Sequence, residues 1–362
     1  MRNYFRILFA SLNIILAVAL LGSYASNRIS PEQIWYIAFL GLIYPLLLFA
    51  NIFFILFWLW RKKWFFLISL ITIIAGLQNI SRFIQFRLFK NDDIKLANTV
   101  KTISYNVRLF NLYQWEEEDS TSYHILNFVK EQNPSVICFQ EFVTTKKQIT
   151  EKYIDTILRE YPYKHVYYTY KLSPEVNYGL ATYSRFPIAR VNSTRFMNTS
   201  NAFIYSDIVI GSDTIRVFNV HLQSIKLDKK TLLLSDSTLR LDSRHISEAK
   251  IVSGRLKVAY IKRAQQADEL RWHIVRSPYP VIVLGDFNDT PVSYSYNTIR
   301  GDLQDAFTGS GEGLGSTYRG IFPTIRIDYI FHSESLTSFN YRTYRVNLSD
   351  HFPISCEFYP GN

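Results

Sequence analysis

Six apolar stretches of the sequence each end on side chains that carry amide, carboxylate or imidazole groups. These polar groups belong to Asn106, Glu141, Asn219 with His221, Asp286 with Asn288, Asp328, and Asp350 with His351. Carboxylate and amide oxygens suit a hard cation such as Mg²⁺ or Mn²⁺, and the sequence has no Cys/His cluster of the kind that binds zinc. The set predicts a site where a cation and an activated water act together.

The stretch 281–289 illustrates how a strand end delivers such groups. Residues 281–284 are apolar and mostly β-branched, which is typical of a buried strand. Gly285 allows a sharp turn, and Asp286 and Asn288, two positions apart, leave the strand end on the same side. An ordinary Gly-Asp turn after a strand is the alternative. The recurrence of such polar groups at six strand ends favours a site, where two histidines beside acids suit a phosphate group.

Short apolar segments separated by polar or amphipathic ones begin at about Thr99. Strands are predicted at 100–106, 136–141, 163–170, 178–184, 188–196, 202–210, 214–220, 281–284, 324–331 and 352–359. Helices are predicted at 120–132, 144–160 and over most of 246–275. Many strands with few helices predict two β-sheets packed face to face, with the helices outside.

The first 98 residues have a different character, because three stretches in them carry no charge: 7–25, 34–60 and 64–80. About 20 apolar residues are enough to cross a bilayer, so we predict three transmembrane helices, with room for tilt in the second. Tryptophan and tyrosine residues cluster at the ends of these stretches, as interfacial aromatic residues do.

The short flanks of these stretches predict the orientation. Arg2 and Arg6 precede the first stretch and residues 61–63 are all basic, whereas the first loop has only Arg28. The positive-inside rule places the N-terminus and the second loop in the cytoplasm. We therefore expect an integral protein of a bacterial inner membrane whose later part lies on the outer, periplasmic side. Cleavage at a signal-peptidase-like site at 22–25 would also leave that part outside.

Charge is distributed unevenly along the chain. The net charge is +10 over 362 residues, but residues 1–98 hold ten basic and three acidic side chains, a net +7 that leaves only +3 for the rest. This modest remainder is weak evidence for nucleic-acid binding. A basic insertion at about 225–262 is either a solvated helix surface or a basic arm that meets phosphate headgroups or a nucleic-acid backbone.

The motifs of the later part resemble those of the endonuclease/exonuclease/phosphatase superfamily. The resemblance covers roughly residues 99–362 and rests on Ser-Tyr-Asn106, Gln-Glu141, Asn-Val-His221, Gly-Asp286-Phe-Asn288, Arg-Ile-Asp328-Tyr and Ser-Asp350-His351-Phe-Pro. It implies a four-layer α/β sandwich that hydrolyses phosphoester bonds with Mg²⁺ or Mn²⁺. By this resemblance Glu141 ligates the metal with help from Asn106, and Asp350 is a further metal or water ligand.

The remaining residues receive catalytic roles by the same resemblance. Asp286 positions or deprotonates the attacking water, and Asn288 orients the phosphate or the water. His351, held by Asp328, contacts the scissile phosphate. His221 matches the second histidine of the deoxyribonuclease and sphingomyelinase branches.

Three functions are compatible with this pattern. The first is a membrane-anchored phosphodiesterase that acts on a lipid headgroup, which the three predicted spans favour. The second is an envelope nuclease acting on DNA or RNA, which His221 favours. The third is an inactive membrane-bound interaction module, although every expected catalytic position is occupied. No obligate protein partner is predicted.

Overall fold

The computed structural model describes residues 2–86, 99–113, 120–225, 243–320 and 325–360. Contacts divide the chain into two compact units. The first unit contains Met1–Ile80, Gln223–Asp268 and Asp289–Ile299, and the second contains Ser81–Leu222, Glu269–Asn288 and Arg300–Asn362. The domain boundary predicted at residue 98 and part of the basic insertion, 226–242, lie outside the described residues.

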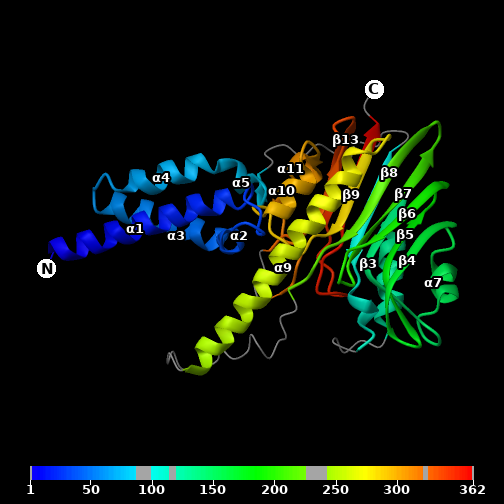
Figure 1. The fold of residues 1–362 in the computed structure, drawn as a ribbon. Coiled ribbons are helices and arrows are strands. Elements are labelled where there is room, and N and C mark those ends of the chain that lie inside the picture. Colours follow the sequence, from blue (N-terminus) through cyan, green and yellow to red (C-terminus); the bar gives the residue numbers. More distant parts are fainter. Residues whose placement is uncertain (1, 87–98, 114–119, 226–242, 321–324, 361–362) are drawn as a thin grey trace. The chain divides into compact units, whose positions relative to one another are not determined.

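The second unit contains two six-stranded sheets (Figure 1). One has the order β13-β14-β2-β3-β5-β4, formed by Leu336–Thr343, Ile354–Pro360, Val100–Asn106, Val136–Thr145, Val176–Ser184 and Tyr163–Ser173. The other has the order β10-β12-β9-β8-β7-β6, formed by Gln304–Asp305, Asp328–His332, Val281–Asp286, Asp213–His221, Ala202–Ile210 and Ile188–Arg195. Among the strands that the structure describes, only β2/β3 and β8/β9 are parallel neighbours, so the prediction of mostly antiparallel sheets is confirmed. A small ladder joins β1 (Ile84–Gln85) to β11 (Gly313–Leu314).

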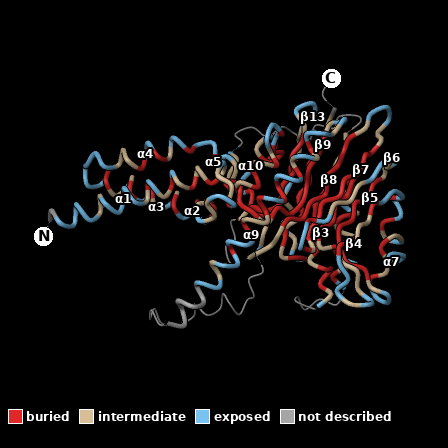
Figure 2. Tube along the Cα trace, in the orientation of Figure 1, coloured by how far each residue is buried: buried red, intermediate tan, exposed pale blue. Residues whose placement is uncertain are grey.

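Both faces of each sheet are covered, which explains why the strands are almost continuously apolar. In β3, Ile137 and Phe139 face a core that includes α6 (Thr121–Glu131) and α7 (Glu151–Ile157), whereas Val136 and Cys138 face the core between the sheets. Figure 2 shows how much of β3, β8 and β9 is buried.

The outer face of the other sheet packs against the C-terminal end of α9 (Ser243–Val275), where the rings of Phe203 and His273 are 4.9 Å apart. The arrangement is the predicted four-layer α/β sandwich. Shorter elements complete the fold: the 3₁₀ helix η1 (Arg108–Asn111), α10 (Tyr294–Arg300) and α11 (Ala306–Ser310). The helix predicted at 144–160 is shorter than expected, because β3 continues to Thr145 and α7 begins only at Glu151.

The first unit contains α1 (Arg2–Ala25), α2 (Trp35–Leu42), α3 (Tyr44–Trp60), α4 (Phe66–Ala75) and α5 (Leu77–Ser81), the last of which ends in the second unit. Among the described residues, one helix is long and apolar enough to cross a membrane, and α2 with α3 forms a second candidate that is bent by 61°. The prediction was three spans, but the described residues do not contain three clear ones. The stretch 34–60 breaks at Ile43, before Pro45, and the stretch 64–80 breaks at Gly76, where the ring of Tyr24 occupies the place of a side chain.

Polar side chains are buried inside the bundle of α1, α3 and α4, together with apolar ones such as Leu20 and Phe54. Asn13 donates to Ser69 Oγ (2.6 Å), Ser69 donates to Asn51 Oδ1 (2.8 Å), and Trp58 Nε1 donates to Asn13 Oδ1 (3.0 Å). These polar groups are fully or almost fully buried, whereas large side chains such as Ile15 are mostly exposed. Hydrogen-bonded polar residues inside and apolar residues outside are typical of helices that pack together in lipid.

Gly285 is required by the close approach of two strands. Its φ is +144°, and a Cβ atom added there would lie 2.0 Å from the carbonyl oxygen of Val220. We expect Gly285→Ala to lower the free energy of unfolding by at least about 3 kcal/mol, since neither backbone can move away without breaking the β8/β9 ladder. Urea unfolding followed by circular dichroism would measure this change.

Gly211→Ala is the matched control. Gly211 also has a positive φ, +62°, but no atom lies within 4 Å of its added Cβ. Gly211→Ala should lower the free energy of unfolding by only about 1–2 kcal/mol, the usual cost of a left-handed residue. Equal destabilisation by the two substitutions would contradict the steric explanation.

Candidate active site

The polar groups predicted at strand ends come together because the parallel strands end at the same edge. In the first sheet Asn106 of β2 lies opposite Gln140 of β3. In the second sheet Asp286 of β9 lies opposite His221 of β8 on one side and opposite Asp328 of β12 on the other. The register alone therefore places His221, Asp286 and Asp328 side by side.

Asp286 is the centre of the group, and its side chain is almost completely buried. Asn106 Nδ2 donates to Asp286 Oδ2 (3.0 Å) from the other sheet. The backbone N–H of Asn288 donates to Oδ1 (2.8 Å), and its side-chain amide donates to Oδ2 (3.0 Å) and to the carbonyl oxygen of Leu222 (3.0 Å). Burial raises the pKa of Asp286 to about 7, with the charge of His351 opposing this shift and that of Asp328 adding to it.

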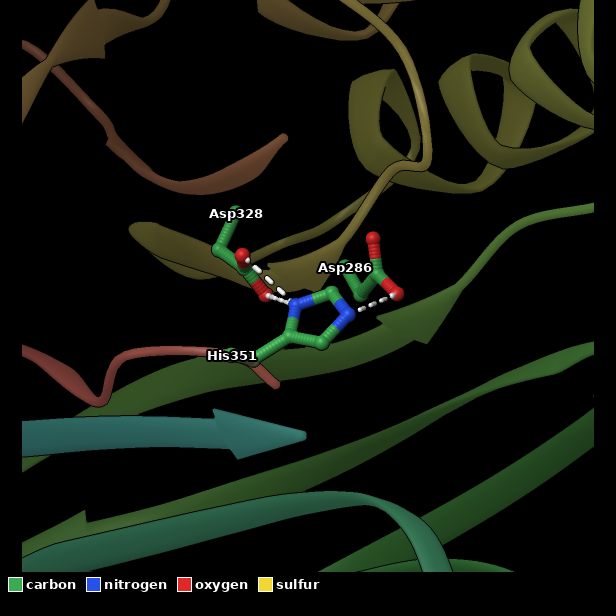
Figure 3. A group of neighbouring side chains, drawn as sticks. All are labelled: Asp286, Asp328 and His351. Carbon is green, nitrogen blue, oxygen red and sulfur yellow. Dashed lines mark hydrogen bonds and ion pairs between the residues drawn. The ribbon is translucent and has the colours of Figure 1, made fainter. Parts of the chain in front are cut away.

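His351 lies between two carboxylates, as Figure 3 shows. Its Nδ1 is 2.9 Å from Asp328 Oδ2, and its Nε2 is 3.8 Å from Asp286 Oδ2. Burial lowers the pKa of His351, but the carboxylates of Asp328 and Asp286 outweigh burial and raise it well above 6.5. The imidazole is therefore protonated at neutral pH, with one N–H on Asp328 and the other toward Asp286.

His221 has the opposite character. Burial, with the charge of His351, lowers the pKa of His221 to about 3, so this imidazole is neutral. Its Nδ1 is 3.2 Å from the hydroxyl of Tyr178, and burial raises the pKa of that hydroxyl well above 10, so the hydroxyl keeps its proton. When this hydroxyl donates to Nδ1, the proton of the neutral imidazole is on Nε2. Nε2 is buried without a hydrogen-bond partner, 3.7 Å from both Glu141 Oε1 and Asp286 Oδ2.

Glu141 and Asp350 contribute two further carboxylates. Glu141 lies where β3 bulges between Phe139 and Phe142, with a φ of +51°. Burial, and then the charge of Asp350, raises the pKa of Glu141. Arg108 Nε lies 3.3 Å from Asp350 Oδ2, at the start of a left-handed turn that directly follows β2.

The charge of the group fits a divalent cation. Glu141, Asp286, Asp328 and Asp350 are four carboxyl groups, with His351 beside Asp328 and Arg108 beside Asp350. Burial raises the pKa values of Glu141 and Asp286, and a bound cation would offset the cost of their ionisation. The ligand atoms of Asp286, Asp328 and His351 lie within 4.8 Å of one another and could hold a metal ion, whereas the oxygen donors of Glu141, Asn106 and Asp350 are the set that suits a hard cation.

The structure differs from the sequence pattern at two places. Asn219 faces the interior between the sheets, where Gln140 donates to its Oδ1 (2.7 Å) and its Nδ2 donates to the carbonyl oxygen of Ala181 (3.0 Å), so it joins the sheets. The sequence pattern did not identify Tyr178 and Arg108 as site residues. Tyr178 resembles an ordinary core aromatic of a strand, and only the sheet order places it beside His221.

Cation binding can be measured without an activity assay. Protons compete with a cation for buried carboxylates, so the affinity for Mn²⁺ should rise with pH through about 7, the region where Asp286 loses its proton. Glu141→Gln should weaken Mn²⁺ binding by at least about 10-fold, since it removes one charged donor. Electron paramagnetic resonance titration of free Mn²⁺ measures both effects.

Glu151→Gln is the matched control for this titration, because Glu151 is an exposed residue whose carboxylate accepts from Tyr168 (2.7 Å). It should bind Mn²⁺ as the unmodified chain does. An affinity that Glu141→Gln leaves unchanged would exclude Glu141 from the cation site.

Comparisons with known proteins identify the family. The model of the family described as "Endonuclease/Exonuclease/phosphatase family" matches residues 103–351, and a model described as "Domain of unknown function (DUF8431)" matches residues 6–83. The search of curated proteins gives no match.

Solved structures have the same fold at low sequence identity. An endonuclease/exonuclease/phosphatase from Beutenbergia cavernae is 15% identical with a TM-score of 0.54, over 73% of this chain and 72% of that one. A family protein from Bacteroides thetaiotaomicron is 18% identical with a TM-score of 0.52, over 72% and 94%. The human Nocturnin catalytic domain is 17% identical with a TM-score of 0.51, over 74% and 96%.

The matched residues span well over half of the chain and include every predicted site residue, from Asn106 to His351. The chain therefore belongs to the endonuclease/exonuclease/phosphatase family, whose members are metal-dependent hydrolases that act on phosphoester bonds.

Proposed function

We propose that this chain is a membrane-anchored phosphodiesterase that uses Mg²⁺ or Mn²⁺ and hydrolyses its substrate by attack of water. The observation that carries the proposal is the pairing of a buried carboxylate, Asp286, with a protonated imidazole, His351, 3.8 Å away. One group accepts the proton of a water molecule and the other donates to a phosphate oxygen. Phosphoester hydrolysis needs a general base and an oxyanion donor that lie close to each other, as these two groups do.

Glu141, Asn106 and Asp350 are the residues that would hold the cation. When bound, the cation polarises the phosphoryl group and lowers the pKa of water. Asn106 has a second task, because its amide donates to Asp286 (3.0 Å) and fixes the rotamer of that side chain. The hydroxyl of Ser349 in turn donates to the carbonyl oxygen of Asn106 (2.8 Å), which ties the Asp350-His351 segment to the end of β2.

Asp286 and Asn288 would act on the water. Asn288 donates twice to Asp286, from its backbone and from its side chain, so the carboxylate has one fixed orientation. In the proposed reaction the water oxygen attacks phosphorus, the proton of the water passes to Asp286, and the ester P–O bond breaks, with the leaving oxygen taking its proton from solvent. A pKa near 7 suits a group that must accept a proton at neutral pH.

The two histidines would bind the phosphate. Asp328 holds the ring of His351 and keeps it charged, so that Nε2–H faces the developing negative charge. His221 is neutral and offers a second N–H from Nε2. Its place beside Asp286 resembles the deoxyribonuclease and sphingomyelinase branches, which keeps an envelope nuclease as the second candidate function.

Membrane anchoring and a lipid substrate are supported by the first unit. α1 is long and apolar enough to cross a bilayer. The bundle of α1, α3 and α4 buries the hydrogen-bonded Asn13 and Asn51 and exposes many large apolar residues, as helices that pack together in lipid do. Together with the basic residues at 61–63, this supports an inner-membrane protein. With the N-terminus and residues 61–63 in the cytoplasm, the second unit lies on the periplasmic side only if the shorter apolar stretch 64–80 also crosses the membrane. Such an enzyme meets lipid headgroups at high local concentration.

His351→Ala should abolish hydrolysis while the protein stays folded. Removing one positioned donor to a developing oxyanion typically lowers the rate by about 10²–10³. The panel consists of phospholipid vesicles, plasmid DNA, RNA and bis-p-nitrophenyl phosphate, each with Mg²⁺, Mn²⁺ or EDTA. We expect cation-dependent cleavage of phospholipid, none in EDTA, and loss with His351→Ala.

His124→Gln is the matched control, since His124 is exposed on α6, and it should retain full activity. Cleavage of only DNA or RNA would replace the lipid assignment by the nuclease. Full turnover by His351→Ala, or activity on nothing with several metals, would contradict the proposed mechanism.

Tyr178→Phe tests the role of His221. Loss of the hydroxyl frees His221 Nδ1, so the proton no longer has to be on Nε2. We expect kcat to fall by about 10-fold with little change in KM, because the lost hydrogen bond matters most in the transition state. The matched control is Tyr170→Phe, an exposed position on β4. A change in KM alone would show that Tyr178 only shapes the substrate site.

A further inference from the structure

The helix α2 leaves the direction of α3 by 61°, so it does not continue that span. One side of α2 is held by the first unit itself: Ala38 packs with Leu256 and Tyr260 of α9, and the carbonyl oxygen of Gly41 accepts from Thr290 Oγ1 (3.3 Å). The other side carries Tyr36 and Phe39, which are 61% and 41% exposed. An apolar, aromatic helix exposed on one side is typical of a membrane–water interface.

The part of α9 that packs on α2 exposes a strip of basic and apolar side chains. Ile251 and Val258 are 53% and 54% exposed, and their neighbours Lys250 and Lys257 are exposed too. Ile251 and Val258 are seven residues apart, and so are Lys250 and Lys257. Seven residues make two helical turns, so the two apolar and the two basic side chains line up along the helix. Leu256 and Tyr260, which contact α2, are buried on the other side.

We propose that this strip (Lys250, Ile251, Lys257 and Val258) rests on the surface of an anionic lipid bilayer. The proposal rests on the membrane anchoring proposed above and names a second contact with the same membrane. Lysines near an anionic surface are attracted to the headgroups, while Ile and Val side chains enter the acyl boundary. The packing of α9 on α2 holds the strip in the same unit as the apolar N-terminal helices.

A nucleic-acid backbone is the competing occupant for basic residues, but the exposed apolar side chains favour lipid. A phosphate backbone gains affinity from cations and leaves Ile251 and Val258 without a partner. On a bilayer the lysines are attracted to the headgroups, and the apolar residues are removed from water. The consequence is that α9 fixes the first unit against the membrane surface, and lipid charge would control how firmly it does so.

The test is a fluorescence measurement on the full chain in nanodiscs. Ile251→Cys and Val258→Cys are labelled singly with an environment-sensitive dye, and the native Cys138 and Cys356 are completely buried and stay unlabelled. In phosphatidylglycerol nanodiscs that contain a nitroxide on the acyl chain, we expect both labels to be quenched. A label at Leu172→Cys, on an exposed part of β4, should not be quenched.

Charge reversal supplies the second arm. Each lysine near an anionic surface contributes a factor of about 5 in binding, so Lys250→Glu/Lys257→Glu should weaken contact by about 25-fold or more and remove the quenching. Phosphatidylcholine nanodiscs should remove it as well. Lys146→Glu/Lys147→Glu, two exposed lysines of the second unit, is the matched control and should leave the quenching unchanged.

Unquenched labels at both 251 and 258 in anionic nanodiscs would overturn the proposal. Labels that respond to added DNA or RNA and not to lipid would also overturn it and would assign the strip to nucleic acid. The readout is independent of catalysis, so an inactive enzyme with quenched labels would contradict only the proposed reaction. A full chain that is recovered without membranes would contradict the anchoring itself.

Discussion

The hydrogen bond from Asn106 Nδ2 to Asp286 Oδ2, 3.0 Å long, is the contact on which the site depends. It joins the end of β2 in one sheet to the end of β9 in the other. A buried carboxylate is costly to desolvate, and the donors from Asn106 and Asn288 reduce that cost. Both strand ends must therefore be in register for the carboxylate to be tolerated, and the same register places His221 and Asp328 beside it.

The sequence predicted most of this site because polar residues at strand ends follow simple rules of sheet geometry. Side chains two positions apart share a face, and parallel neighbours end at one edge. These rules identified His221 and Asp286 as neighbours, but they do not say how far from the strand end a side chain lies. Asn219 shares the face of His221, yet it lies two residues earlier, about 7 Å deeper along β8, where it joins the sheets.

What the sequence did not predict depends on contacts that no local pattern encodes. Tyr178 acquires its role only because β5 and β8 approach each other between the sheets. Asn288 itself was predicted, but not the positive φ of +53° beyond the end of β9 that turns it back onto Asp286. Hydropathy also joined α2 and α3 into one span, since both are apolar. It could not detect the bend before Pro45, or that Ala38 is buried against α9.

Charge explains why the two histidines differ. Asp286 and Glu141 lie close to Asp328 and Asp350, so a phosphoester, which adds at least one negative charge, is repelled from the group when these carboxyls are ionised. A divalent cation would offset this repulsion, whereas a second charged imidazole would weaken the attraction for that cation. Burial keeps His221 neutral, and when the hydroxyl of Tyr178 donates to Nδ1, the N–H of His221 faces the site. One histidine thus supplies charge and the other supplies only a hydrogen bond, which leaves room for both the cation and the phosphate.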